Sequence, residues 1–205
     1  RIAKLAIEHQ LNSDTHFLTN SSPQDFSLDL RELYISWFTN YGEIKLGKQI
    51  YSWGMVDENS PLDNINAYDY YYLFFGGTDR KIGSYSLGMD LYYENWKFST
   101  VFSPIHNTNR LPLNDPNFPI QFSIVPQEHQ ILEISGNPIE YGSSVQRSFS
   151  NGELRLSFFN GYDRLFNFSG INVFAWQPGD LSFPDIDIVY GYRKTQQINV
   201  GGVIL

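Results

Sequence analysis

The stretch from residue 30 to residue 54 constrains the fold most, because it places two strand-length segments on either side of a short turn. It reads LRELYISWFTNYGEIKLGKQIYSWG and is rich in aromatic and β-branched residues. The turn falls at residues 40–42, where Asn and Gly accept a positive φ at little cost. In the first segment Leu33, Ile35 and Trp37 alternate with polar residues. Because side chains alternate along a strand, the pattern predicts a β-hairpin with one apolar and one polar face.

The segment 81–93 alternates most regularly. Its apolar parity begins with Tyr85 and ends with Tyr93, and other apolar residues lie between them, whereas Ser and Asp occupy the opposite parity. A turn at residues 94–95 leads into the segment 96–103, which alternates in the same way. Aromatic rings at both ends of an apolar strand face are typical of strands that cross a membrane, because amphipathic rings lie at the two interfaces.

Connections of two lengths join the strand-like segments. Short turns lie near residues 41, 94 and 151, whereas the other connections are long, including the loop predicted for residues 161–184. Further alternating segments, which bring the total to about eight strands, cover residues 1–9, 141–149 and 153–158 and continue from about Lys194. In outer-membrane barrels one rim carries short turns and the other carries long loops. The pattern therefore predicts an all-β fold, an antiparallel up-and-down transmembrane β-barrel that is part of a larger barrel.

Composition and charge narrow the class of protein. The 205 residues are interpreted as one domain, 1–205, and no window approaches the roughly 18 apolar residues of a transmembrane helix. A net charge of −8 with dispersed Lys and Arg disfavours nucleic acid as a partner. The chain starts at Arg1 and stops inside the apolar run 203–205, so we expect a fragment truncated at both ends. A soluble, aromatic-rich β-sandwich that binds carbohydrate is the alternative fold.

Short motifs along the chain carry a resemblance to a known family. They are Leu30, Arg31 and Glu32; Leu46, Gly47, Lys48 and Gln49; Trp53, Gly54 and Asp57; Asp63, Asn66 and Asp69; and Phe159, Asn160, Gly161, Tyr162 and Asp163. On these motifs the chain resembles bacterial outer-membrane porin-like proteins, a group similar to the alginate-export porins. That family usually has Arg at the position of Lys48 and Pro at the position of Ala67.

The resemblance implies a channel for passive diffusion of small solutes across the outer membrane of a Gram-negative bacterium. It also implies contact with membrane lipid and lipopolysaccharide. A homo-oligomer and association with other outer-membrane proteins both stay open as assembly states. A structural, assembly or binding barrel with a plugged lumen is the alternative function.

Charged residues on the polar parity are the predicted lining of the pore, where they tune which solutes pass. By parity they are Lys4, Glu8, Glu32, Asp90, Lys97, Glu140 and Arg155, and Lys48 is added to them on other grounds. Lys48 shares its parity with apolar neighbours, and a charge that faces lipid near the midplane is costly. Either this arm of the hairpin turns Lys48 inward, with Tyr51 and Trp53 toward lipid, or a bulge resets the register. We expect Lys48 to point inward. The alternative is that the charged residues are solvated members of a polar face without individual roles.

Apolar and aromatic residues on the opposite parity are the predicted lipid-facing surface. They are Leu33, Ile35, Trp37, Tyr85, Leu87, Met89, Leu91, Tyr93, Trp96, Phe98 and Phe102.

Sequence motifs for metal binding or catalysis are sparse. The acidic residues Asp57, Glu58, Asp63 and Asp69 offer oxygen ligands for calcium, but their spacing matches no EF-hand, and a solvated acidic loop is the favoured interpretation. The four His lack metal-ligand spacing, and no nucleophile elbow, phosphate-binding loop or dinucleotide fingerprint is found. We therefore expect no enzymatic activity and no cofactor.

Overall fold

The computed structural model describes residues 3–13, 26–51, 53, 63–72, 80–113, 118, 126–132, 134, 138–174 and 185–204. This part of the chain is all-β, with short 3₁₀ turns at Tyr70–Tyr72 and Glu128–Gln130. The strands are β1 (Ala3–Ser13), β2 (Phe26–Thr39), β3 (Gly42–Gln49), β4 (Ala67–Tyr68), β5 (Lys81–Ile82), β6 (Ser84–Tyr93), β7 (Trp96–Ser103), β8 (Ile131–Leu132), β9 (Glu140–Phe149), β10 (Gly152–Tyr162), β11 (Asn167–Phe174), β12 (Asp185–Gly191) and β13 (Lys194–Ile204). Within the described ranges, no helix is long and apolar enough to cross a membrane.

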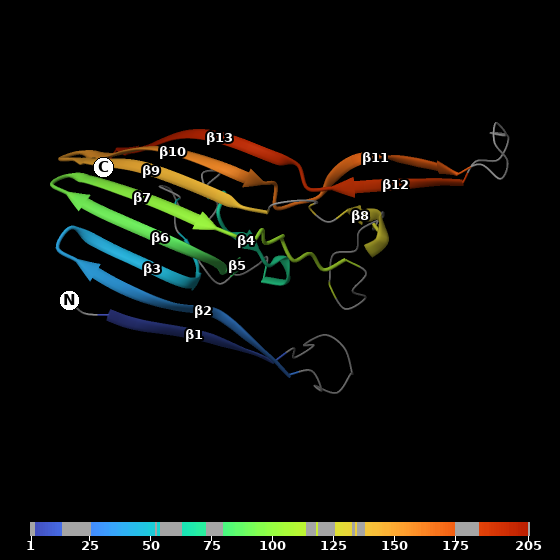
Figure 1. Cartoon of the computed structure of the whole chain (residues 1–205), viewed down its shortest axis with the longest axis horizontal. Helices are drawn as coiled ribbons and strands as arrows, with labels where there is room; N and C mark the ends of the chain where they lie inside the picture. Colours follow the sequence, from blue (N-terminus) through green and yellow to red (C-terminus); the bar gives the residue numbers. More distant parts are fainter. Residues whose placement is uncertain are drawn as a thin grey trace.

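An eight-stranded antiparallel sheet dominates the molecule. Its order is β1-β2-β3-β6-β7-β9-β10-β13, so strands adjacent in this sheet follow one another along the chain (Figure 1). Two-residue turns at residues 40–41, 94–95 and 150–151 lie together at one end of the sheet, at the left of Figure 1, which confirms the three predicted hairpins. Among the described strands, β1 and β13 form the two edges and do not pair with each other, so no barrel closes.

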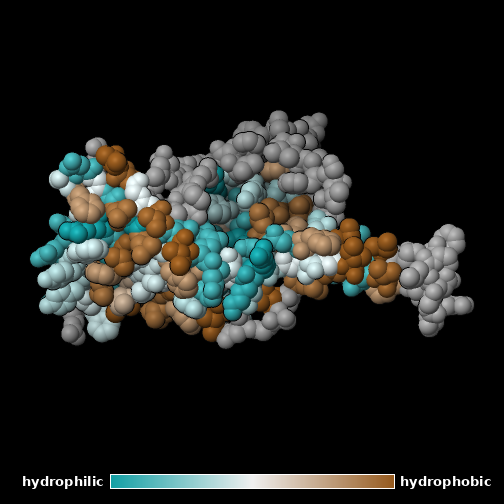
Figure 2. Space-filling model, turned by 90° about the horizontal axis from the view of Figure 1, so that it is seen from above, coloured by the Kyte–Doolittle hydropathy of each residue, from teal (hydrophilic) through white to brown (hydrophobic). Residues whose placement is uncertain are grey.

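The two faces of this sheet carry apolar and polar side chains in the reverse of the arrangement in a water-soluble protein, where the apolar face is buried. Apolar residues form cross-strand rows, such as the row that runs from Ile35 through Leu46 and Leu87 to Phe102. These side chains are exposed, as Leu87 is at 45 %, whereas Ser86 on the opposite face is only 4 % exposed. Figure 2 shows apolar side chains, coloured brown, reaching the molecular surface. The apolar face is therefore the outer one, and the polar face is covered.

The chain after β3 supplies part of that cover. Tyr51 and Trp53 lie against the polar face, and Trp53 forms a small buried cluster with Ile65, Val101 and Phe159. Two glycines of the sheet make room for the two aromatic rings. A Cβ on Gly88 would lie 2.7 Å from the Tyr51 hydroxyl, and a Cβ on Gly142 would lie 2.8 Å from the Trp53 ring. We call residues 50, 51, 53 and 63–72 the inner segment.

The prediction of a long loop over residues 161–184 is wrong in part, because this range contains β11. This strand pairs antiparallel with β12, which pairs in parallel with β8. The hairpin of β11 and β12 projects beyond the ends of β10 and β13 (Figure 1). A register shift between Phe168 and Gly170 explains why sequence periodicity missed β11, since a bulge moves the apolar side chains to the other parity.

Candidate functional site

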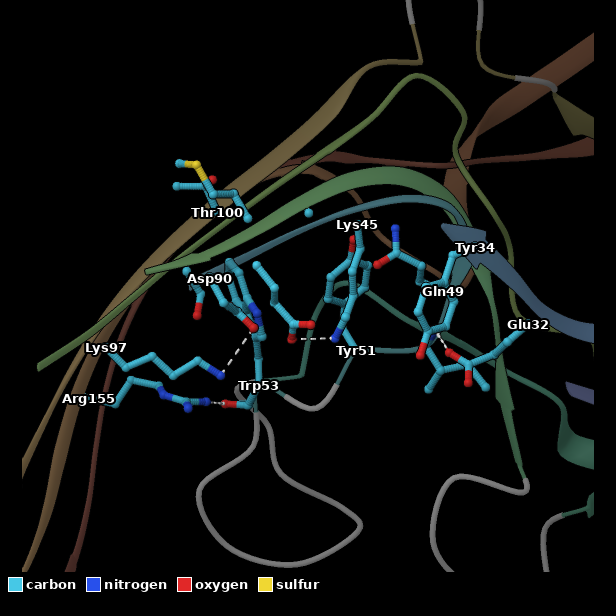
Figure 3. Close-up of a pocket in the computed structure, with 15 residues that line it drawn as sticks. Glu32, Tyr34, Lys45, Gln49, Tyr51, Trp53, Asp90, Lys97, Thr100 and Arg155 are labelled. Atoms are coloured by element: carbon cyan, nitrogen blue, oxygen red, sulfur yellow. Dashed lines mark hydrogen bonds and ion pairs between the residues drawn. The ribbon is translucent and has the colours of Figure 1, made fainter. Parts of the chain in front are cut away.

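A cavity of about 240 Å³ lies on the polar face of the main sheet. Four of the predicted pore-lining residues contribute to it: Glu32 from β2, Asp90 from β6, Lys97 from β7 and Arg155 from β10. Figure 3 shows the strands arching over these side chains, whereas Thr100 points to the other side of the sheet. The alternation of side chains along each strand thus brings together charges that are far apart in the sequence.

Two ion pairs form a row across this cavity, which we call the charge row. Lys45 lies 2.7 Å from Glu43 within β3, and Lys97 of β7 lies 3.3 Å from Asp90 of β6. Glu43 and Asp90 are directly opposite in the β3–β6 ladder. Like charges in that position repel each other, so each carboxylate is stabilised by its own lysine. All four side chains stay partly exposed to the cavity.

Two further charges in the cavity hold the inner segment. Arg155 is buried, and its Nη1 donates a hydrogen bond of 2.6 Å to the carbonyl oxygen of Trp53. The same guanidinium donates to Gln146. Glu32 accepts a hydrogen bond of 2.7 Å from the backbone N–H of Ile50. These two residues therefore fix the chain that crosses the polar face.

A buried polar cluster links the two parts of the inner segment to each other. Lys81 forms an ion pair with Asp63, and both side chains are almost completely buried. The side-chain amide of Asn66 donates to Asp63 and to the carbonyl oxygen of Tyr51, while its oxygen accepts from the Tyr51 N–H at 2.9 Å. Asn66 thus replaces a strand partner for the backbone of Tyr51, and the backbone polar groups of this covered segment are satisfied.

A second buried cluster contains Glu140, which was predicted to line the pore. Its carboxylate lies 2.8 Å from Nη1 of Arg164 and 2.8 Å from Nδ1 of His106. Arg164 also donates to the backbone oxygens of Asn64 and Ile65, at 3.1 Å and 2.7 Å from its Nη2. The cluster therefore joins the start of β9 to the inner segment. Glu140 is buried in this structure and does not belong to the cavity of the charge row.

Two tyrosines of the inner segment have strongly shifted acidities. Burial raises the pKa of Tyr68 to about 12, and the carboxylate of Asp63 adds to this increase. Burial likewise raises the pKa of Tyr51 to about 12, although the hydrogen bond to Ser86 acts in the opposite direction. In both cases the surroundings disfavour the phenolate.

The predicted inward orientation of Lys48 is wrong. Its direct neighbours in the sheet are Leu33 and Tyr85, which belong to the exposed apolar face. Lys48 is the penultimate residue of β3, and its ammonium group donates to the carbonyl oxygen of Leu30. A lysine at a strand end reaches past the apolar surface with its flexible stem, so the expected cost of a charge at mid-strand does not arise. The expectation that Tyr51 and Trp53 face outward is wrong as well.

The remaining predicted residues fall in several places. Lys4 and Glu8 pair with Ser36 and Glu32 in the β1–β2 ladder, and their side chains lie outside the described part. Of the calcium candidates, Asp63 and Asp69 form ion pairs with Lys81 and Arg110, and Asp57 and Glu58 lie outside the described residues. No group of three or more potential metal ligands occurs among the described residues.

The residues predicted to face lipid lie on the exposed face of the sheet. Exposed ones are Leu33, Ile35, Trp37, Tyr85, Leu87, Tyr93, Phe98 and Phe102, and partly buried ones are Met89, Leu91 and Trp96. Arg147 shares this face and lies over the rings of Trp96 and Phe149, with its guanidinium carbon 4.9 and 5.0 Å from the ring centres. It stands near the turn end of β9, where a charge can reach water.

Comparisons of the whole chain with family models, with curated proteins and with solved structures give no match in any of the three.

Proposed function

We propose that the eight-stranded sheet is part of the wall of a porin-like β-barrel in the outer membrane of a Gram-negative bacterium, a channel for passive diffusion of small solutes. The observation that carries the proposal is the reversed distribution of side chains, with Leu87 exposed and Ser86 covered in the same strand. A sheet of this kind is stable when hydrocarbon covers its apolar face and water or polar groups cover the other. Further strands that pair with β1 and β13 would complete the wall.

The spacing of aromatic residues supports a membrane-crossing role. Tyr85 and Tyr93 bracket the apolar face of β6. Eight residues at about 3.4 Å each cover ~27 Å along the strand. A tilt of about 40° reduces this height to ~21 Å, close to the roughly 25 Å apolar band of outer-membrane barrels. The three short turns also lie together at one end of the sheet, and the strand ends that longer connections join lie at the other end, as they do in such barrels (Figure 1).

The polar face supports a water-filled path. The charge row faces the cavity, and the inner segment lies beside it and narrows the space in front of the sheet. In this mechanism solutes diffuse past the inner segment, and the row of paired charges acts on them during passage. No energy input is required.

Reconstitution of the full-length protein in planar bilayers tests this proposal. We expect stepwise conductance, and Lys97→Glu should shift the ion selectivity toward cations because it leaves Asp90 without its cationic partner. Arg193→Glu, in the exposed connection between β12 and β13, makes the same charge change away from the cavity and should leave selectivity unchanged. A well-folded protein that gives no conductance would contradict the channel.

A barrel with a plugged lumen is the second candidate function, and one observation favours it. The inner segment is held by buried contacts of Arg155 and Arg164, which is what a plug requires. In that case conductance is absent, and the connections at the loop end of the sheet bind a partner. The bilayer measurement separates the two candidates directly.

A further inference from the structure

The charge row carries equal numbers of cationic and anionic groups, and these groups are ordered in space. Its two carboxylates, Glu43 and Asp90, lie side by side in the middle, and Lys45 and Lys97 flank them. We propose that this row is a binding station for small zwitterionic solutes. The inference rests on the proposed channel and names the class of solute that the channel passes best.

The solute's ammonium group fits between the two central carboxylates. Glu43 and Asp90 repel each other across the β3–β6 ladder, so a cation placed between them relieves this repulsion. The solute's anionic group then lies within reach of Lys45 or Lys97, which gives up part of its contact with a carboxylate. A zwitterion therefore replaces one ion pair with two, and no charge is left without a partner.

Solutes with a single charge do not have this advantage. An anion that takes Lys97 leaves Asp90 beside Glu43 without its counter-ion, and a cation between the carboxylates displaces a lysine that finds no new partner. The other two charges in the cavity are one cation and one anion, so they keep its charge balanced, and both Arg155 and Glu32 hold the backbone of the inner segment. The cavity of about 240 Å³ lies below the roughly 300–1,000 Å³ typical of pockets for drug-sized ligands, so the solutes are small.

Tracer influx into proteoliposomes of the full-length protein tests the inference. Four small probes that cross lipid slowly are compared: taurine as the zwitterion, isethionate as its anionic analogue, choline as the cation and erythritol as the neutral solute. We expect taurine influx to saturate with concentration and to exceed that of isethionate and choline several-fold. If the probes enter but taurine shows neither saturation nor preference, the binding station is refuted and the channel stands. If no probe enters, the channel itself fails.

Variants of the charge row provide the second arm. The double variant Glu43→Gln with Asp90→Asn leaves both lysines exposed to the cavity, so we expect saturation by taurine to disappear and isethionate to become the fastest charged probe. Glu94→Gln, in the exposed turn between β6 and β7, removes a carboxylate outside the cavity and should keep the wild-type order of probes. Unchanged taurine saturation in the double variant would overturn the assignment, and the wild-type comparison tests it even if that variant does not fold.

Discussion

Arg164 lies just after β10 and makes several buried contacts. Its guanidinium contacts the Glu140 carboxylate, His106 and backbone oxygens of the inner segment, and the side chain is only 10 % exposed. Arg164→Ala leaves the Glu140 carboxylate buried without its cationic partner, so we expect the free energy of unfolding to fall by about 3–5 kcal/mol. Urea unfolding in lipid vesicles measures this loss. Arg193→Ala, in the exposed connection between β12 and β13, is the matched control. An equal loss of stability in both variants would contradict the assignment of Arg164 to the buried cluster.

Tyr68 makes the free energy of unfolding depend on pH in the alkaline range. Its pKa is about 12 in the folded protein and 10.0 ordinarily, so below pH 10 both the folded and the unfolded state keep the phenolic proton. Between pH 10 and pH 12 the unfolded state loses this proton first, and the free energy of unfolding falls as the pH rises. Tyr68→Phe should make this fall less steep. Unfolding titrations over that range measure it, and Tyr41→Phe at the exposed first turn should keep the wild-type slope.

At the scale of a strand, β6 carries the sharpest test of what covers the sheet. Leu87 lies inside the apolar face that Tyr85 and Tyr93 bracket, whereas Tyr93 lies at its end. In a membrane-crossing strand, Leu87→Lys should cost about 2–4 kcal/mol of unfolding free energy, and a lysine near the interface should cost ~0–1 kcal/mol. Tyr93→Lys is therefore the matched variant. If the face were covered by water, Leu87→Lys would change stability by no more than about 0.5 kcal/mol.

The strands with regular alternation could be predicted from the sequence, and those with a local irregularity could not. The three hairpins follow from period-two patterns around turns that contain Asn or Gly. In β11 the register shift after Phe168 breaks the pattern. In β12 the apolar residues Ile186, Ile188 and Tyr190 do alternate, so periodicity alone was enough to predict this strand. Lys48 shows a related limit. Its inward orientation was predicted from the cost of a charge in the membrane. The register of the first hairpin gives the opposite result, because it pairs Trp37 with Ile44 and therefore turns Lys45 inward and Lys48 outward.

For the molecule as a whole, the sequence predicted four of the charges that line the cavity, but not which of them bind the inner segment. Strand parity brought Glu32, Asp90, Lys97 and Arg155 to one cavity, because alternation is local. The contacts of Arg155 with Trp53 join residues 102 positions apart in the chain, and no local pattern encodes such a contact. The inner segment was missed for the same reason, since its position depends on the space that glycines on distant strands leave open.

The inner segment also allows a test of how the whole molecule controls passage. Trp53 lies against Gly142 and belongs to the buried cluster that holds this segment on the polar face. In Trp53→Ala the loss of the ring removes that packing, while the ladder of the main sheet keeps its hydrogen bonds. We expect the reconstituted full-length variant to insert, to conduct more current per channel than the wild type and to fluctuate more between levels. Trp37→Ala, on the exposed face of β2, removes the same side chain without touching the inner segment and should keep the wild-type conductance. An unchanged conductance in Trp53→Ala would mean that the inner segment does not limit the path, and the narrowing would then have to lie elsewhere along it.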